Sequence, residues 1–347
     1  MTTEFVKLEK NAPLDEQLVC GAEIIKHGGL VVFPTETVYG LGASALDSDA
    51  AKKIYAAKGR PSDNPLIIHI SNPEEAEKYC VTSDLYYKLA EKFLPGPLTV
   101  IMTKKDIIPK TVTGGLDTVA VRCPENKAAR ELIRLSGVPI AAPSANISGK
   151  PSPTSAEHVR FDLDGKVDMI IDGGECDIGL ESTIVKLDND GATLLRPGAV
   201  TPEMLREVLP SLKIDGGITK KSENDAPPLA PGMKYKHYAP KAQVYLLKGN
   251  KEKITGYINK KLSENEETGV LCFDEMISDI KGKYVISFGK RNDGAAHART
   301  LFSALRFFDK TDVKEIYATS VGTDGIDLAT YNRMLKASGY TVIDLDK

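Results

Sequence analysis

The feature that most constrains this chain is an alternation of short apolar runs with helix-length stretches, which is interrupted once and then resumes. In the first half we expect strands at residues 29–33, 66–70, 98–102, 118–122, 140–143, 169–172, 183–187 and 192–196. Between them we expect helices at residues 14–27, 50–58, 84–93, 127–136, 155–160 and 201–208. This spacing is typical of an α/β domain built on one large twisted sheet.

The interruption covers residues 214–240, which are rich in glycine, proline and charge and show neither a helical nor a strand period. The segment is about twice the length above which a structureless loop becomes uncommon, so we expect a linker, a lid or both. Beyond it we expect strands at 242–249, 268–275, 282–289, 314–321 and 340–345, and helices at 251–262, 295–308 and 328–337. That pattern predicts a smaller, Rossmann-like α/β domain with a parallel sheet. The chain should therefore divide into residues 1–213, 214–240 and 241–347.

Composition excludes several classes of protein. Hydrophobic residues make up 41% of the 347 residues and charged residues 27%, which argues against a disordered chain, a collagen or a coiled-coil rod. The first ten residues mix charges and lack the apolar core of a signal peptide, and no apolar run approaches the ~20 residues that span a bilayer. We therefore expect a cytoplasmic protein that does not enter membranes.

The five cysteines, Cys20, Cys80, Cys123, Cys176 and Cys272, include no CxxC pair. An odd count of scattered cysteines suits reduced thiols in a cytosol, so we expect structural residues and no zinc or iron–sulfur site. Residues 1–213 carry 24 Lys+Arg and 30 Asp+Glu, a net charge of −6, and the remaining residues carry 21 and 18, a net charge of +3. Neither part is a strongly basic nucleic-acid binder.

Two nucleotide-binding motifs are absent or weak. No GxxxxGK[ST] sequence occurs, so there is no P-loop. Residues 40–45 fit the GxGxxA dinucleotide pattern, but Pro34 and five further residues separate the first glycine from the strand expected to end at Phe33. The dinucleotide fingerprint needs that glycine immediately after its strand, so dinucleotide binding is disfavoured.

Polar residues crowd the loop that follows the strand ending at Phe33. Thr35, Glu36, Thr37 and Tyr39 all lie within it. They suit a loop that caps its own backbone. They equally suit a substrate rim, because open α/β sheets bind ligands at the carboxyl ends of their strands.

Two cations, Lys58 and Arg60, lie just past an expected helix end and just before an expected strand. Such a pair can converge on one polyanion from a solvated cavity, or it can simply favour the negative end of the helix dipole. His69, in the alternating strand that follows, is interpreted as a satisfied strand histidine or as a ligand-binding residue. Asn64, between them, is interpreted as structural.

Further polar groups mark other strand ends. Ser144 and Asn146 lie in a run of small residues that would let a flat ligand approach the backbone, although a Ser/Asn-rich turn needs the same residues. Ser182 opens a strand, and Arg122 and Arg196 each close one. Because so many strand ends carry polar or cationic groups, we expect them to converge on one site.

These motifs together resemble a known family. PTETVYGLG, KGRPSDNPL, PGPLTV, SANISGKPS and ESTIV occur in the order found in the YrdC/Sua5 family of threonylcarbamoyl-AMP synthases, over about residues 15–210. Lys58 and Arg60 with Ser144 and Asn146 match that family's KxR…SxN signature. PGMKYKHYAP at 231–240 and the α/β tail resemble the longer, two-domain Sua5 form.

The resemblance implies a twisted mixed sheet whose concave face is a cationic cavity, followed by a smaller Rossmann-like Sua5 domain. It also implies a nucleotidyltransferase that converts L-threonine, bicarbonate (or CO2) and ATP into threonylcarbamoyl-AMP, pyrophosphate and water, with Mg2+ as companion ion. The product would feed formation of N6-threonylcarbamoyladenosine (t6A) at position 37 of tRNAs, and other proteins would carry out the transfer. No side-chain nucleophile is required, since the carbamate itself attacks the α-phosphorus.

The resemblance assigns roles residue by residue. The L-threonine site would comprise Thr35, His69, Arg122, Ala142 and Ser182, with Arg122 facing the substrate carboxylate. Lys58 and Arg60 would supply the charge needed for catalysis. The ATP site would comprise Lys58, Arg60, Ser62, Thr118, Ser144, Asn146, Ser152, Arg196 and, from the linker, Tyr235 and His237.

Two alternatives remain at this stage. The first is an RNA-binding module that uses a cationic cavity as a groove for tRNA or double-stranded RNA, with binding that falls steeply with salt. The acidic balance of residues 1–213 argues against it, and we expect no stable nucleic-acid binding. The second is a carbamoyl-transfer domain like that of hydrogenase-maturation proteins, but the acylphosphatase and zinc-finger segments of those proteins are missing here.

Overall fold

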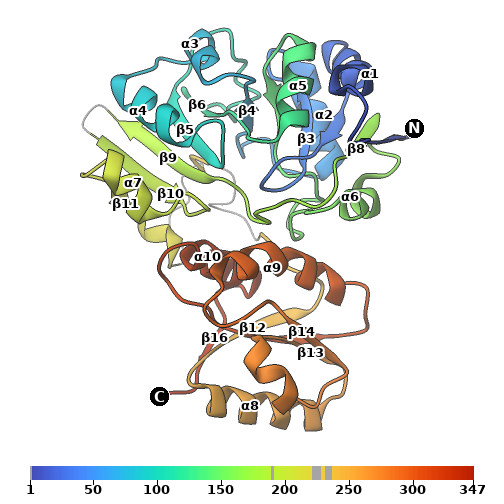
Figure 1. The fold of residues 1–347 in the computed structure, drawn as a ribbon, viewed down its shortest axis with the longest axis vertical. Helices are drawn as coiled ribbons and strands as arrows, with labels where there is room; N and C mark the ends of the chain where they lie inside the picture. Colours follow the sequence, from blue (N-terminus) through green and yellow to red (C-terminus); the bar gives the residue numbers. More distant parts are fainter. Residues whose placement is uncertain (1, 189–190, 221–227, 231–236) are drawn as a thin grey trace. The chain divides into compact units, whose positions relative to one another are not determined.

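The computed structural model of the chain describes residues 2–188, 191–220, 228–230 and 237–347. It divides into two compact units, whose chain paths can be followed by colour in Figure 1. The first unit comprises residues 1–148, 152–218 and 222–234, and the second comprises residues 149–151, 219–221 and 235–347.

In the part of the chain that the structure describes, the first unit is built on one sheet of eleven strands in the order β1-β8-β2-β3-β7-β4-β6-β5-β9-β10-β11. The strands are β1 (Glu4–Lys7), β2 (Val31–Phe33), β3 (Gly40–Ser44), β4 (Ile67–His69), β5 (Leu98–Thr103), β6 (Thr118–Arg122), β7 (Ile140–Ala141), β8 (Met169–Asp172), β9 (Thr183–Asp188), β10 (Gly191–Arg196) and β11 (Lys213–Ile214). Parallel and antiparallel pairs both occur, which confirms the predicted mixed sheet.

The helices of the first unit largely confirm the predicted ones. They are α1 (Leu14–Lys26), α2 (Ser48–Lys58), α3 (Ala76–Tyr79), α4 (Asp84–Phe93), α5 (Lys127–Ser136), α6 (Ala156–Leu163) and α7 (Pro202–Val208), with short 3-10 helices η1 (Pro73–Glu75) and η2 (Gly216–Ile218). The sequence pattern did not predict β1, α3 or the two 3-10 helices, which are all six residues or shorter.

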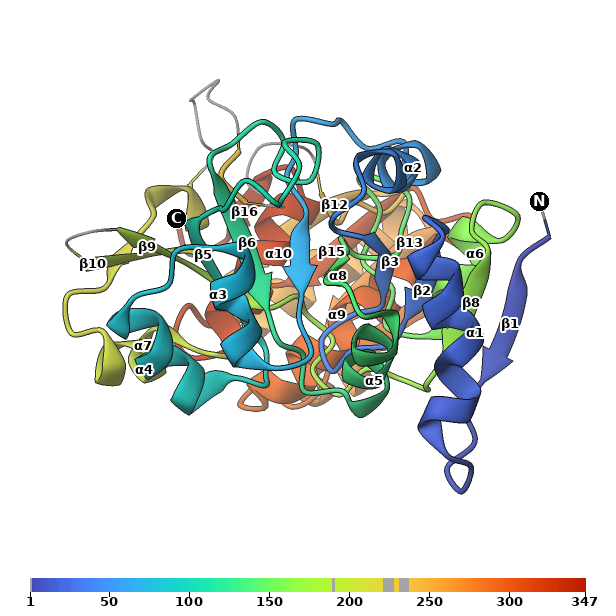
Figure 2. The same cartoon turned by 90° about the horizontal axis from the view of Figure 1, so that it is seen from above.

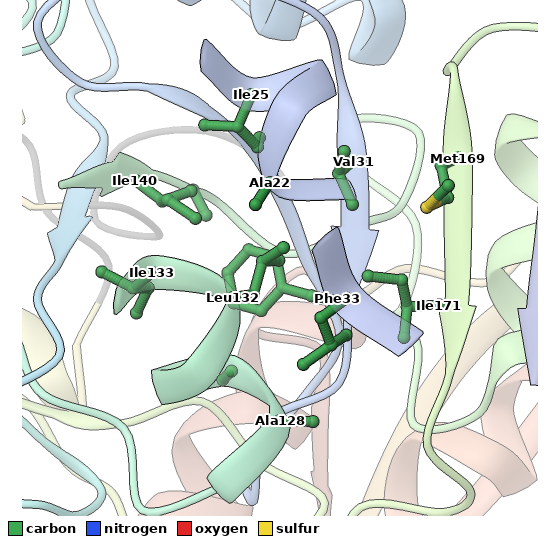
Figure 3. Packing of buried hydrophobic residues seen from close by; sticks show 13 residues of the cluster. Ala22, Ile25, Val31, Phe33, Ala128, Leu132, Ile133, Ile140, Met169 and Ile171 are labelled. Atoms are coloured by element: carbon green, nitrogen blue, oxygen red, sulfur yellow. The ribbon is translucent and has the colours of Figure 1, made fainter. Parts of the chain in front are cut away.

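Two helices, α1 and α5, pack on one face of this sheet (Figure 3). Ile25 of α1 and Leu132 of α5 are fully buried against Phe33 of β2 and Ile171 of β8. Each fully buried side chain of this size contributes about 1.5–3 kcal/mol of transfer free energy. This cluster therefore anchors β2, and with it the start of the polar loop at residues 34–39.

Residues 40–44 form a strand that the sequence did not predict. β3 pairs antiparallel with β2, and its glycines pack closely against neighbouring side chains. A Cβ atom on Gly42 would lie 2.6 Å from Cγ2 of Ile140, and one on Gly40 would lie 3.0 Å from Cζ of Phe33. The Gly-x-Gly sequence thus permits close packing inside a sheet.

The second unit contains the predicted parallel sheet, in the order β14-β13-β15-β12-β16 among the described residues. Helix α8 lies on one face of this sheet, and α9 and α10 lie together on the other (Figure 1). Its elements are β12 (Gln243–Lys248), α8 (Lys251–Glu264), β13 (Thr268–Cys272), η3 (Asp274–Asp279), β14 (Tyr284–Ser287), α9 (Gly294–Phe308), β15 (Glu315–Thr319), α10 (Asp327–Ala337) and β16 (Val342–Asp344). All five strands expected here are confirmed.

The expected linker begins within regular structure. β11 pairs parallel with β10 through Ile214 and Leu194, and η2 follows directly. The expectation that residues 214–218 lack secondary structure is therefore wrong. Across the described residues, every helix is too short or too polar to cross a bilayer.

Candidate active site

His69 and Arg122 lie side by side at the carboxyl ends of two parallel strands. They are register partners on β4 and β6, which run in the same direction in Figure 2. Each is only 4% exposed. Because register partners on neighbouring strands point to the same face, the imidazole and the guanidinium share one environment.

That environment keeps His69 uncharged. Complete burial, and then the positive charge of Arg122, lower the pKa of His69 to about 3. Its ring meets the ring of Phe33 edge-on, with centroids 5.9 Å apart. Nδ1 is buried and has no hydrogen-bond partner among the described residues. Backbone groups of Ile67 and Ile140 near the ring oppose this lowering but do not cancel it, so His69 is a neutral, buried ring beside Arg122.

Arg122 forms a buried ion pair with Glu36. Its Nη2 lies 2.6 Å from Oε1 of Glu36, and the two side chains are each 5% exposed. Its Nε also donates to the carbonyl of Gly96 at 3.4 Å. No hydrogen bond joins Nη1 to any residue the structure describes. Sequence reasoning placed Glu36 in the polar loop but gave it no role, because its partner lies 86 residues away.

The hydroxyl of Thr35 serves its own loop. It donates to the carbonyl of Val38 at 2.6 Å, lies 2.8 Å from Oγ1 of Thr37, and is within 3.2 Å of the backbone N–H groups of Thr37 and Val38, which donate to it. A hydroxyl has one donor and two acceptor positions, so these bonds use all of them. The capping interpretation of this loop therefore describes the Thr35 side chain.

Ser182 joins residues predicted for the two substrates. Its Oγ lies 2.7 Å from Oγ1 of Thr99, and it accepts from Nη2 of Arg196 at 3.2 Å. Nε of Arg196 donates to the Ser182 carbonyl at 3.0 Å. The predicted threonine-site serine and the predicted ATP-site arginine are thus in direct contact. Ala142, just after β7, is buried, and its N–H donates a hydrogen bond to the carbonyl of Ile67.

Lys58 connects the two halves of the KxR…SxN signature. Helix α2 begins after its N-cap Asp47 and ends at Lys58, because Gly59 adopts the left-handed conformation with φ 60°. From there the Lys58 ammonium donates to the carbonyls of Ser144 and, at 2.5 Å, Asn146. Segments 86 and more residues apart are thereby held together.

Both signature cations are buried. Lys58 is 1% exposed and Arg60 is 8% exposed, so neither side chain has the solvent exposure that we expected for it. Arg60 donates to the carbonyls of Asn64 at 3.3 Å and Pro65 at 3.1 Å. Asn64 is itself buried, and its Oδ1 has no hydrogen-bond partner among the described residues.

Side-chain hydrogen bonds order both ends of the Ser144–Ser152 segment. The Ser144 hydroxyl donates to Oδ1 of Asn146 at 2.6 Å, and Nδ2 of Asn146 donates to the carbonyl of Ile147 at 2.9 Å. Ser152 donates to the carboxylate of Glu181, which is buried. Glu181 is a second acidic residue to which the sequence assigned no role.

Two further residues predicted for the ATP site, Ser62 and Thr118, take no part in the hydrogen bonds described above. Ser62 is exposed. Thr118 begins β6, and at ~3.3 Å per residue it lies about 13 Å along the strand from Arg122. His237 belongs to the second unit, where its ring lies 5.5 Å from that of Tyr238. Tyr235 lies outside the described residues.

Comparison with known proteins assigns both parts of the chain to one enzyme family. The Sua5–YciO–YrdC family, described as "Telomere recombination", matches residues 23–198. A second family, described as "Threonylcarbamoyl-AMP synthase, C-terminal domain", matches residues 200–339. A threonylcarbamoyl-AMP synthase of Bacillus subtilis is 45% identical over 331 residues, which is 95% of each chain. One of Pyrococcus abyssi is 46% identical over 333 residues, which is 93% of this chain and 94% of the relative.

Solved structures match this chain over its whole length or over its first part. The crystal structure of P. abyssi Sua5 complexed with L-threonine matches with a TM-score of 0.91 at 45% identity, covering 99% of each chain. Escherichia coli YciO matches with a TM-score of 0.51 at 24% identity over 56% of this chain, which shows a shared fold only. The chain therefore belongs to the Sua5/YrdC family of threonylcarbamoyl-AMP synthases, in its two-domain Sua5 form.

Proposed function

We propose that this protein is an L-threonylcarbamoyladenylate synthase, a nucleotidyltransferase that uses ATP. The observation that carries the proposal is the Lys58 ammonium bound to the carbonyls of Ser144 and Asn146, because it assembles the KxR…SxN signature from distant segments. The buried Arg122, with Nη1 unbonded to the described residues, supports an adjacent site for an amino-acid carboxylate.

The reaction has two steps. The uncharged amine of threonine attacks the carbon of bicarbonate. Water leaves, and a carbamate is formed. A carbamate oxygen then attacks the α-phosphorus of ATP, the bond to the β-phosphate oxygen breaks, and pyrophosphate leaves. The carbamate is labile in water, so burial of the residues around it favours the second step.

On the threonine side, Arg122 binds the substrate carboxylate through Nη1, and His69 presents its neutral ring edge. Ser182 orients the substrate through its hydroxyl, which is hydrogen-bonded to the hydroxyl of Thr99 and to the guanidinium of Arg196. Thr35 and Ala142 complete the site through backbone and apolar atoms, since the Thr35 hydroxyl is already satisfied. Neutral His69 also leaves Arg122 as the cation that meets the carboxylate.

On the nucleotide side, Lys58 and Arg60 supply positive charge to the transferring phosphate, where positioning and charge stabilisation do most of the catalysis. The predicted binding residues are Ser62, Thr118, Ser144, Asn146, Ser152, Arg196, Tyr235 and His237. A concave cationic cavity and a lid at residues 214–240, between domains 1–213 and 241–347, belong to this proposal.

Mg2+ would arrive with the triphosphate. Among the described residues no group of three or more His, Cys, Asp or Glu side chains could hold a metal ion. Mg2+ is commonly held by substrate phosphates, waters and one or two carboxylates, so such a group is not required. We further propose that the protein acts in the cytoplasm and passes its product to separate proteins that modify tRNA.

Pyrophosphate release from ATP tests the proposal. It should require threonine and bicarbonate together, and mass spectrometry should detect threonylcarbamoyl-AMP. Omission of either co-substrate serves as the control. Pyrophosphate release that is independent of threonine, or adenylation of free threonine without carboxylation, would contradict the proposed reaction.

A further inference from the structure

Glu36 is a buried acid whose carboxylate is directed at the guanidinium of Arg122. It lies in the loop after β2 and is 5% exposed. Its Oε1 is 2.6 Å from Nη2 of Arg122, and its Oε2 accepts a long hydrogen bond, 3.5 Å, from the N–H of Asn126, the N-cap of α5. Its backbone carbonyl accepts from the N–H of Ile178 at 2.9 Å. Several segments therefore hold this carboxylate in place.

The ion pair determines which edge of Arg122 remains available. Nη2 faces Glu36 and Nε faces the Gly96 carbonyl, while Nη1 makes no hydrogen bond to the described residues. An arginine side chain carries considerable rotamer freedom, which would have to be lost when a ligand binds. A guanidinium that is already clamped loses less of that freedom on binding, and its remaining N–H groups point in a fixed direction.

Charge gives a second reason for the pair. Arg122 is buried beside His69, which is neutral and cannot balance it. An unpaired buried cation is strongly unfavourable, so some anion must accompany Arg122 before substrate binds. Glu36 supplies that anion without occupying Nη1. The cation can thus remain buried and oriented while the amino-acid site is empty.

We propose that Glu36 is a positioning residue for amino-acid recognition: its carboxylate holds Arg122 so that Nη1 meets the substrate carboxylate. This inference rests on the proposed function, because it requires threonine to bind at Arg122. This role differs from a general structural role because it affects the binding of only one of the two substrates. Loss of Glu36 should weaken recognition of threonine and leave recognition of ATP nearly unchanged.

The first test compares Glu36→Ala and Glu36→Gln with the wild-type full-length protein. Glu36→Ala should raise the KM for threonine by ~10–100-fold, the effect of losing a charge-assisted contact, with the KM for ATP within about threefold. Glu36→Gln keeps an oxygen acceptor near Nη2 and should recover part of the loss. Asp168→Ala is the matched control, since it removes a carboxylate that accepts from the Leu30 N–H ahead of the same strand β2. It should leave both KM values unchanged.

A double-mutant cycle tests whether Glu36 acts through Arg122. Arg122→Ala alone should raise the KM for threonine at least as much as Glu36→Ala. The double variant should be no worse than Arg122→Ala, because residues in contact are not additive. Wild-type protein should also prefer L-threonine to L-threoninamide, which lacks the carboxylate, and Glu36→Ala should reduce that preference.

The outcomes separate this inference from the proposed function. Wild-type protein that makes no threonylcarbamoyl-AMP would overturn both. Active wild-type protein with an unchanged threonine KM in Glu36→Ala, an equal rise in both KM values, or full additivity in the double variant would overturn the role of Glu36 alone. Thermal unfolding of every variant, and the isosteric Glu36→Gln, keep the test valid if Glu36→Ala folds poorly.

Discussion

The ammonium of Lys58 lies 2.5 Å from the backbone carbonyl oxygen of Asn146, 88 residues further along the chain. It also donates to the carbonyl of Ser144, and the Lys58 carbonyl in turn accepts from the N–H of Ser148 at 2.9 Å. A residue expected to bind phosphate or to favour the helix dipole thus also holds the turn that would bind the nucleotide. Stability and activity should therefore be coupled at this position.

Replacing Lys58 by alanine should destabilise the protein as well as inactivate it. The change leaves buried carbonyls without their donor, which costs about 1–3 kcal/mol for each unsatisfied group. We expect a lower midpoint of thermal unfolding and synthesis reduced by ~10–150-fold. Lys52→Ala, on the exposed side of the same helix, is the control and should change neither. An unaltered unfolding midpoint for Lys58→Ala would mean that the carbonyl contacts carry little energy.

Acid should destabilise the protein through His69. Its pKa is about 3 in the folded protein and ~6.5 when unfolded, so the unfolded chain binds the extra proton between those values. Stability should therefore be unaffected by His69 above pH ~6.5 and should fall as pH drops below it, by up to ~1.4 kcal/mol per pH unit. Denaturant unfolding at pH 4, 5, 6 and 7.5 should show a shallower fall for His69→Gln. Identical slopes for the two proteins would show that His69 is protonated without penalty.

The same neutral histidine predicts a feature of the activity profile. Because His69 does not ionise between pH 6 and 8 in the folded state, its titration should not appear in the rate over that range. Wild-type protein and His69→Gln should therefore show the same shape of pH–rate curve there, although the variant turns over more slowly. An inflection near pH 6.5 present only in the wild type would contradict this prediction.

Amino-acid selection should depend on the hydroxyl more than on the methyl group of threonine. A missing methyl is worth ~1–3 kcal/mol, so serine should be a poor but detectable substrate. A site that hydrogen-bonds the hydroxyl leaves buried polar groups unpaired when valine binds, so valine should be rejected far more strongly. Competition assays of pyrophosphate release with the three amino acids measure this. Equal rates would show that the assigned pocket is not the threonine site.

Thiol reactivity should follow burial. Cys20 is exposed, whereas Cys80, Cys123, Cys176 and Cys272 are buried and none forms a disulfide. Burial raises the pKa of the Cys80, Cys123 and Cys272 thiols to about 12, and raises that of Cys176 further, so little thiolate exists at neutral pH. A thiol reagent should therefore titrate one rapidly reacting cysteine in the native protein and five in denaturant. Cys20→Ser should abolish the rapid reaction without loss of synthesis.

The elements of regular structure were largely predictable because their signal is local. The five strands of the second unit, with amphipathic helices between most of them, each occur where the period indicates. β3 was missed because Gly40 and Gly42 are typical of turns. Only the packed sheet shows that Phe33 and Ile140 leave no room for a side chain there. The conformational preference of a residue can be judged from its own segment, whereas close packing depends on side chains that other segments bring to it.

The candidate site, like the fold, was predictable only where its signal is local. By itself, the sequence determined which residues are candidates for the chemistry: the cations Lys58 and Arg60, the Ser144–Asn146 turn, and the polar ends of the strands that carry His69 and Arg122. Only the tertiary structure decided which of these groups are buried and what they bind, including the Arg122–Glu36 pair and the Lys58 ammonium on two carbonyls. The physical reason is that burial and pairing arise between segments some 86 residues apart, where no local period records them.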